Sequence, residues 1–466
     1  MEQDYLLSRM QLPPLPATIH FVGIGGIGMS GLARIMATRG YQVTGSDASD
    51  SPSLAALRDD GFAVTAGHSA AGLGDPALVV TSAAVPETNP ELAAARERGI
   101  EIVKRAALLG LLCNEQVCIA VGGTHGKSTT AGMLAFALDR VGISPSFAVG
   151  ACVNQLGANA GAGRSEVFVA EADEYDYSFL WLRPTVGIIT NIEFDHPDIF
   201  PSLSAVEDAF LQFAERIRTG GTLVISADDP RCQRLTARLQ APIIKTTFGF
   251  DPDADWRVVQ AEGGDAVRSP GGPIIPLRLQ VPGRHNLLNA AAAIAAAAAI
   301  GIMPPDLRPG LEAFTGVGRR FEVRGQVNGV TIIDDYAHHP TEIRSTIAAA
   351  RERYPGARLW ALFQPHTYSR TKRLLDEFAT ALGDADRVIL TAIYPARETD
   401  DLGVSSSTIA GRITGAPVDV VGSPEQAAER LSAATTPGDV ALVLGAGDIW
   451  KASEAILATR EHKGNA

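Results

Sequence analysis

The sequence is poor in the features that mark secreted, membrane-bound and nucleic-acid-binding proteins. It has four cysteines without CxxC or zinc-site spacing, which favours reduced, mostly buried thiols in a cytosolic protein. Basic residues number 40 and acidic residues 52, so the net charge of −12 argues against non-specific binding to nucleic acid or to a membrane surface. Glycine and proline, at 47 and 28 residues, stay well below the ~25–30% of a disordered chain.

Long apolar runs are also missing. The uncharged stretch at residues 290–303 is rich in alanine and shorter than the ~18 apolar residues that a membrane span needs, so we expect a packed helix there. Residues 1–4 (MEQD) lack the basic and apolar segments of a secretion signal. These observations predict a cytoplasmic protein with no membrane insertion.

Short apolar runs alternate with helical patterns along the chain, which predicts an α/β fold with mostly parallel sheets. At ~150 residues per domain, the 466 residues correspond to about three domains. We place the boundaries to give domains 1–113, 114–322 and 323–466. The strands expected lie at residues 18–22, 41–45, 77–81, 100–103, 116–121, 167–170, 186–190, 222–226, 330–333, 359–363, 387–390, 418–421 and 440–444, with a small β-rich insertion at residues 241–281.

The strongest motif is GGTHGKST at residues 122–129, between an expected strand and an expected helix. Glycines let backbone N–H groups close on phosphate oxygens, a lysine reaches the β- and γ-phosphates, and a hydroxyl holds Mg²⁺. Gly126, Lys127 and Ser128 supply these groups. Because the strict pattern requires glycine where this chain has Val121, we interpret the segment as a variant phosphate-binding loop built around Gly123.

Acidic residues follow the next strands of this domain. The strand at residues 167–170 leads into Glu171, Asp173 and Glu174, and the strand at residues 186–190 leads into TNIEFDHPD. Magnesium prefers oxygen ligands, and ligands of open α/β sheets bind at the carboxyl ends of strands. After a phosphate-binding loop, these two segments predict a metal site, although each alone could be a solvated loop.

A second glycine cluster, GIGGIG at residues 23–28, follows the first expected strand, and Asp47 ends the next one. This spacing suits a diphosphate at a helix N-terminus with the acid on a ribose hydroxyl. It could equally be a glycine turn needed for helix packing. A nicotinamide-dependent oxidoreductase is one interpretation, but it leaves Lys127 and the acidic residues after it unexplained.

Three further polar segments follow strands or precede helices. Residues 283–289 (GRHNLLN) could cap the alanine-rich helix or contact a base edge. Residues 334–340 (DDYAHHP) carry adjacent histidines that point in different directions, so a shared metal is not expected. Residues 364–370 (QPHTYSR) end in a cation that could reach an anionic substrate.

Taken together in order and spacing, these motifs resemble the Mur ligases, the ATP-dependent amide-bond enzymes of peptidoglycan synthesis. The resemblance covers nearly the whole chain and also includes GRRFE at residues 318–322. It implies a Rossmann-like UDP-sugar-binding domain, a central ATPase domain and a C-terminal Rossmann-like domain. Within the family, the third-domain motifs are most similar to members that join L-alanine to the lactyl carboxylate of UDP-N-acetylmuramate, with ATP and Mg²⁺. It also implies a monomer or weak homodimer.

The resemblance further implies roles for individual residues. ATP would be bound by Gly123, Thr124, His125, Gly126, Lys127, Ser128, Thr129, His285, Asn289, Arg320 and Asp335. The UDP-sugar would be bound by Gly25, Gly26, Gly28, Asp47, His68 and Ser82. The metal would be held by Ser128, Glu171 and His196. The alanine and the reacting carboxylate would lie near Tyr336, His338, His366 and Arg370. Catalysis would depend on Lys127, His196, His338 and Arg370, and either His196 or His338 could accept the amine proton.

Two departures from the family pattern stand out. Several members use a carbamylated lysine soon after the strand-end histidine, but no lysine occurs between His196 and Lys245. Thr367 occupies a position where related enzymes often carry arginine. Two alternatives remain: a sister ligase that recycles a cell-wall tripeptide onto the same UDP-sugar, and a regulatory P-loop protein that binds nucleotide without making amide bonds.

Overall fold

A computed structural model describes residue 7 and residues 10–463 of the chain, so the leader prediction for residues 1–4 lies outside the described residues. The chain forms two compact units. The first unit holds the chain up to Glu193 together with Ser204–Arg278 and Leu288–Phe314. The second unit holds Phe194–Leu203, Leu279–Leu287 and the chain from Thr315 onward.

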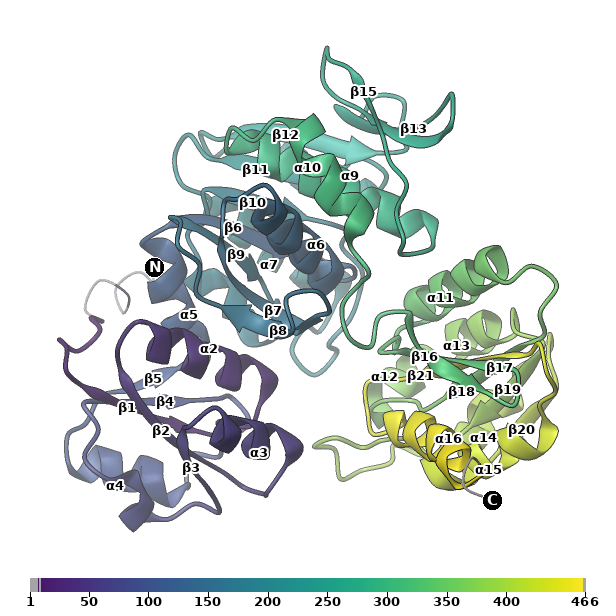
Figure 1. The fold of residues 1–466 in the computed structure, drawn as a ribbon, viewed down its shortest axis with the longest axis horizontal. Helices are drawn as coiled ribbons and strands as arrows, with labels where there is room; N and C mark the ends of the chain where they lie inside the picture. The colour runs from purple at the N-terminus through teal and green to yellow at the C-terminus, as the bar shows by residue number, and fades with distance from the viewer. Residues whose placement is uncertain (1–6, 8–9, 464–466) are drawn as a thin grey trace. The chain divides into compact units, whose positions relative to one another are not determined.

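The N-terminal part of the first unit is a five-stranded sheet in the order β3-β2-β1-β4-β5, with all pairs parallel (Figure 1). Its elements are β1 (Thr18–Val22), α2 (Ile27–Thr38), β2 (Gln42–Asp47), α3 (Pro52–Asp59), β3 (Ala63–Ala66), β4 (Leu78–Thr81), α4 (Pro90–Glu97), β5 (Ile102–Lys104) and α5 (Arg105–Asn114). The strand order reverses at β1, between β2 and β4. Open α/β sheets bind ligands at such a switch point, and the loop after β1 is the glycine cluster.

A ten-stranded sheet forms the centre of the first unit, in the order β15-β14-β13-β12-β11-β10-β6-β9-β7-β8. Its strands are β6 (Val117–Gly122), β7 (Ser146–Val153), β8 (Ala158–Gly161), β9 (Val167–Glu171), β10 (Val186–Ile189), β11 (Thr222–Ser226), β12 (Ile244–Gly249), β13 (Trp256–Ala261), β14 (Gly264–Arg268) and β15 (Ile274–Pro276). The expected β-rich insertion therefore continues this sheet, because β12 pairs in parallel with β11.

The helices of this part include the alanine-rich segment. They are α6 (Lys127–Arg140), the 3₁₀ segment η2 (Tyr175–Trp181), α7 (Leu203–Glu215), α8 (Pro230–Arg238), α9 (Arg284–Ala299) and α10 (Pro304–Ala313). In α9 the side chains from Ala290 to Ala297 are buried, so alanine there provides close packing. No helix among the described residues combines the length and the apolar character that a bilayer crossing requires.

The second unit is built on a six-stranded sheet in the order β16-β17-β21-β18-β19-β20, in which only β16 pairs antiparallel. Its strands are β16 (Glu322–Val327), β17 (Val330–Asp335), β18 (Leu359–Phe363), β19 (Arg387–Leu390), β20 (Val418–Val420) and β21 (Val440–Leu444). Its helices are α11 (Pro340–Arg353), α12 (Tyr368–Arg373), α13 (Leu375–Leu382), α14 (Ser406–Ala410), α15 (Pro424–Ala434) and α16 (Trp450–Lys463). Separate apolar clusters cover the two sheet faces.

The expected α/β class and most expected strands are confirmed, five of them with identical bounds: β1, β11, β18, β19 and β21. The strands β3, β7, β8 and β16 were not expected. Three of the four cysteines are buried, as predicted, whereas Cys152 is exposed.

Helix α2 packs closely on the edge strand β8 of the central sheet. The Asn159 side chain donates from Nδ2 to the Ile27 carbonyl at 2.8 Å. A Cβ added to Gly31 would lie 2.6 Å from the Cβ of Ala160, so the helix can approach the strand this closely only because residue 31 is glycine.

Candidate functional site

The phosphate-binding loop lies between β6 and α6, where the motif predicts it. Gly123 has φ +126°, and a Cβ there would be 2.0 Å from Thr190 Oγ1. Gly126 has φ +83° and precedes α6, with Asn289 Oδ1 2.8 Å from the position of a Cβ. Both positions therefore require glycine, and the predicted residue Asn289 lies beside the loop.

Lys127, the first residue of α6, is folded onto its own loop. Its Nζ donates to the Gly123 carbonyl at 2.7 Å and the Thr124 carbonyl at 3.2 Å, and it pairs with Glu174 at 2.8 and 3.0 Å. Burial alone would lower the pKa of Lys127, but the Glu174 and Asp173 carboxylates raise it above its usual value. Glu174 is a site residue that the motif did not single out among the acids after β9.

Ser128 and Glu171, two of the three predicted metal ligands, lie together. Ser128 Oγ donates to Glu171 Oε1 at 3.0 Å, and the other carboxylate oxygen accepts from the Gly150 N–H at 2.6 Å. This pair of oxygen donors, next to the phosphate-binding loop, fits the ligand chemistry of Mg²⁺. The third predicted ligand, His196, belongs to the second unit.

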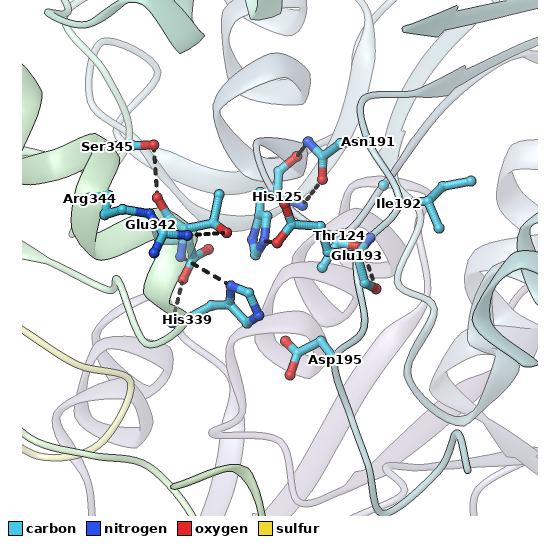
Figure 2. A network of polar contacts seen from close by, with 12 residues as sticks. Thr124, His125, Asn191, Ile192, Glu193, Asp195, His339, Glu342, Arg344 and Ser345 are labelled. Carbon is cyan, nitrogen blue, oxygen red and sulfur yellow. Dashed lines mark hydrogen bonds and ion pairs between the residues drawn. The ribbon is translucent and has the colours of Figure 1, made fainter. Parts of the chain in front are cut away.

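Thr124 and His125 are fixed by the segment after β10 (Figure 2). The His125 N–H donates to Asn191 Oδ1 at 2.9 Å, and Asn191 Nδ2 returns a bond to the His125 carbonyl at 3.0 Å. The Glu193 N–H donates to Thr124 Oγ1 at 2.8 Å, and His125 Nε2 lies 3.3 Å from Glu193 Oε2. Thr129 follows in α6 and is buried. The segment after β10 thus holds the phosphate-binding loop in place, as Glu174 after β9 holds Lys127.

In the N-terminal sheet, Asp47 lies against the glycine cluster. Its Oδ2 accepts from the Gly25 N–H at 2.8 Å and lies 2.9 Å from where a Cβ of Gly25 would be. Gly26 is the N-cap of α2, which has neither a capping side chain nor an acid in its first turn. Ser82, in the loop after β4, accepts from the Ala84 N–H at 3.1 Å.

Arg105 is a basic residue at this loop that the motif analysis missed. Its Cδ and Nη1 would lie 3.1 and 3.2 Å from a Cβ on Gly28, in the first turn of α2. Within residues 10–463, the Arg105 guanidinium makes neither a hydrogen bond nor an ion pair. Arg105 begins α5, which is far in sequence from the glycine cluster, so only the fold brings the two together.

His68, a predicted UDP-sugar contact, belongs to a buried polar cluster. Its Nδ1 lies 2.8 Å from Ser46 Oγ and 3.3 Å from Glu91 Oε2. Glu91 is fully buried, and although burial opposes ionisation, the Ser46 hydroxyl that donates to it and the His20 imidazole 3.7 Å away hold its pKa below the usual value. This carboxylate was not predicted, because it lies inside a helix-forming segment.

In the second unit, Asp335 is the last residue of β17 and Tyr336 follows it. Asp335 accepts from the N–H groups of Phe321 and Ala337, at 3.1 and 2.9 Å, and from the Thr346 hydroxyl at 2.9 Å. Burial raises its pKa to about 6, despite Arg320 nearby. The Tyr336 ring lies 5.0 and 5.3 Å from two guanidinium carbons, those of Arg319 and Arg320. Arg320 also lies 3.3 Å from Glu342.

The remaining predicted residues of the second unit gather around Asp195. Arg370 contacts this buried carboxylate, and His196 Nε2 and His338 Nε2 lie 3.8 and 3.9 Å from its Oδ2. Burial lowers the pKa of His338 to about 3 and that of His366 to about 4, with Arg370 adding to both effects. Both imidazoles are therefore neutral at pH 7. His285, which lies between His196 and His338 in the sequence, is exposed and lies beside Gly283.

Lys245, the next lysine after His196, and Thr367 each have a local structural role. Lys245 Nζ donates to the carbonyls of Thr236 and Leu239, at 3.0 and 2.7 Å, and so binds the C-terminal end of α8. Thr367 has φ +65° and is the N-cap of α12, where its hydroxyl accepts from the Arg370 N–H at 3.4 Å.

Three family descriptions match successive parts of the chain. Residues 18–116 match the catalytic domain of the Mur ligase family. Residues 121–297 match the Mur ligase middle domain, and residues 319–447 match the glutamate ligase domain of Mur ligases.

Similar proteins match over nearly the full length. The chain is 44% identical over 463 residues to UDP-N-acetylmuramate–L-alanine ligase of Mycolicibacterium gilvum, covering 96% of this chain and 97% of that protein. It is 41% identical to the protein of that name in Geobacter sulfurreducens, covering 95% and 97%. The crystal structure of UDP-N-acetylmuramate–alanine ligase from Thermotoga maritima aligns with a TM-score of 0.81 at 30% identity, covering 96% and 100%. A murein peptide ligase from Psychrobacter arcticus aligns with a TM-score of 0.73 at 26% identity, covering 95% and 98%.

Proposed function

Because the chain belongs to the Mur ligase family, we propose that it joins L-alanine to the lactyl carboxylate of UDP-N-acetylmuramate, with release of ADP and phosphate. The observation that carries this proposal is the match, over more than nine-tenths of the chain, to relatives named for that ligation. The family assignment also removes the support for a nicotinamide oxidoreductase, because the glycine cluster lies in a Mur ligase domain.

The reaction needs activation of the carboxylate, since its oxyanion is a poor leaving group. ATP transfers its γ-phosphoryl group to the carboxylate, and the alanine amine then attacks the resulting acyl phosphate. Catalysis of such a transfer is mostly positioning and charge stabilisation. We assign Lys127 to the β- and γ-phosphates. It must leave Glu174 to reach them, because the lysine and this carboxylate are paired in the structure.

Magnesium, when bound, neutralises charge on the phosphates during the transfer. Ser128 and Glu171 would hold it from the first unit, and His196 is the third proposed ligand. The support is the pairing of the two oxygen donors next to the loop.

The adenine contacts proposed are His285 and Asn289, and Arg320 and Asp335 are proposed to contact ATP. The diphosphate of the UDP-sugar is assigned to the glycine cluster of Gly25, Gly26 and Gly28, with Arg105 as an added cation. Asp47, His68 and Ser82 are proposed for the uridine or the sugar. We assign UDP-sugar binding to residues 1–113, ATP binding to residues 114–322 and amino-acid binding to residues 323–466.

We assign binding of L-alanine and of the reacting carboxylate to a set of four residues: Tyr336, His338, His366 and Arg370. His338 has a defined tautomer: Nδ1 lies 2.9 Å from the Tyr336 carbonyl, which can only accept, so in the neutral ring the free lone pair is on Nε2. That nitrogen is the proposed acceptor of the amine proton, and His196 remains the alternative. We retain the cytoplasm as the location, with a monomer or weak homodimer.

The test is ADP release with magnesium, ATP and UDP-N-acetylmuramate, adding L-alanine, glycine, L-serine or the tripeptide L-Ala-γ-D-Glu-diaminopimelate singly. The fastest release with L-alanine is expected. Release with the tripeptide alone would instead favour the recycling ligase, which the likeness to murein peptide ligase keeps as the second candidate. No release with any acceptor would reject both ligases.

A further inference from the structure

The buried carboxylate of Asp195 binds a residue 175 positions away in the sequence, Arg370 in α12. The two residues are 6% and 5% exposed, and both lie in the second unit. Arg370 is assigned above to the reacting groups, whereas Asp195 has no role in that assignment. Burying a carboxylate is costly unless it is paired, so this position calls for an explanation.

One edge of the Arg370 guanidinium is occupied by Asp195. Nε donates to Oδ1 at 2.9 Å, and Nη2 lies 2.8 Å from the same oxygen. Nη1 lies 3.3 Å from His366 Nδ1. A guanidinium has five N–H groups, so one on Nη1 and one on Nη2 remain. Among the described residues, no further acceptor is hydrogen bonded to this Nη1–Nη2 fork.

The same carboxylate is itself held in place. The His196 N–H donates to Oδ1 at 2.8 Å, and Oδ2 faces the Nε2 atoms of His196 and His338 at 3.8 and 3.9 Å. The Arg370 backbone is held by Thr367, which accepts its N–H at 3.4 Å, and the guanidinium itself is held by Asp195 and His366. The guanidinium therefore has little freedom to rotate.

We propose that Asp195 is a positioning residue for the ligation, which holds the Nε–Nη2 edge of Arg370 and so presents the Nη1–Nη2 fork to the anionic acyl substrate. A planar fork matches two oxygens of a carboxylate or phosphate group, and a fork fixed in advance loses little rotamer entropy on binding. The inference rests on the proposed function.

The experiment measures ADP release by the full-length chain carrying Asp195→Asn, Arg370→Ala or both. Asp195→Asn keeps the shape but removes the charge. We expect its kcat to fall by on the order of a hundredfold, the effect of a misplacement of about 1 Å, while the KM for ATP stays within about twofold. Because Asp195 acts through Arg370, the double variant should be no slower than Arg370→Ala alone.

The matched control is Asp198→Asn, an exposed acid three positions along the same segment, which should keep wild-type kcat. Asp195→Glu covers the case in which Asp195→Asn does not fold. It retains the charge but shifts the carboxylate by one methylene, and we expect at least a tenfold lower kcat with an unchanged melting temperature.

Two results would overturn the inference while wild-type ligation is intact. One is a double variant whose loss equals the product of the two single losses, which would show that the residues act independently. The other is wild-type kcat in Asp195→Glu or in a folded Asp195→Asn. A wild-type chain that ligates no acceptor would reject the proposed function, and the inference with it.

Discussion

Lys127 and Glu174 form a buried ion pair in which the lysine Nζ lies 2.8 Å from one carboxylate oxygen and 3.0 Å from the other. The lysine that we propose to bind the ATP phosphates is therefore already paired with a carboxylate. The charge partner of Lys127 must therefore change when nucleotide binds.

The first prediction concerns this exchange. Glu174→Gln should lower the free energy of unfolding by about 3 kcal/mol, because it removes the carboxylate that is directly paired with the buried lysine. ATP should then raise the melting temperature of the variant more than that of the wild type, since phosphates replace the lost charge. Differential scanning fluorimetry with and without ATP measures both effects.

The control for that substitution is Asp176→Asn, an acid 44% exposed that pairs with Lys104 at 3.8 Å. A surface pair of this kind contributes little, so its melting temperature and its ATP shift should match the wild type. Equal ATP shifts in Glu174→Gln and the wild type would contradict the exchange.

A second prediction concerns the backbone of the phosphate-binding loop. Gly123→Ala should abolish ATP binding, because the new Cβ would be 2.0 Å from Thr190 Oγ1 and the loop must move. Gly157→Ala is the matched control: its φ is +62° with open space around it, so only the backbone cost of roughly 1–2 kcal/mol applies. Calorimetric titration with ATP compares the two, and retained affinity in Gly123→Ala would contradict the prediction.

A third prediction tests Arg105 at the glycine cluster. Arg105→Ala should raise the KM for UDP-N-acetylmuramate by roughly 10–100-fold, the value of one charge-assisted hydrogen bond, and leave the KM for ATP unchanged. Arg98→Ala removes a guanidinium that pairs with Asp75 on the surface and should alter neither constant. Initial-rate kinetics would refute the assignment if both KM values rose together.

A fourth prediction follows from the low pKa of His366. Its folded pKa of about 4 is below the ordinary imidazole pKa of 6.5, so the unfolded chain binds more protons between these two pH values. The free energy of unfolding is therefore highest above pH 6.5, where His366 is neutral in both states. It falls as the pH falls toward 4, because protonation of His366 favours the unfolded chain. His366→Gln should reduce the stability difference between pH 7 and pH 4 by about 2–3 kcal/mol.

Urea unfolding across this pH range measures the effect of His366→Gln. The groups that act on His366 are Arg370, Asp195, Glu398 and His196, and none of them is changed by the substitution. Parallel stability curves for the variant and the wild type would contradict the prediction.

Sequence patterns located the elements better than the contacts between them. Strands such as β18 and β21 are continuous apolar runs, so their bounds could be predicted to the residue. The strand β8 is the four residues ANAG, and β16 contains a glycine at a register shift, so neither has a strand-like composition. Short strands of this kind are defined by their pairing partners, which a local pattern does not contain.

The same limit applies to the candidate site. The phosphate-binding loop is one continuous motif, and its position and glycine requirement follow from the sequence. The acid that pairs with Lys127 could not be chosen among three neighbours, because the choice depends on the turn after β9. Arg105 and Asp195 reach their neighbours only through the fold, and neither has a local signal that separates it from surface charges.

The contact between α2 and β8 also limits how the sequence can evolve. Gly31 and Ala160 face each other so closely that any side chain at residue 31 would meet the Cβ of residue 160 at 2.6 Å. Substitution at residue 31 cannot be rescued by a smaller side chain at residue 160 unless that residue becomes glycine. Evolutionary change at these two positions is therefore coupled. A larger residue at position 31 should appear only with a displacement of α2, or with glycine at position 160 and a moved Asn159 side chain, because Asn159 Nδ2 lies 2.9 Å from the same Cβ position.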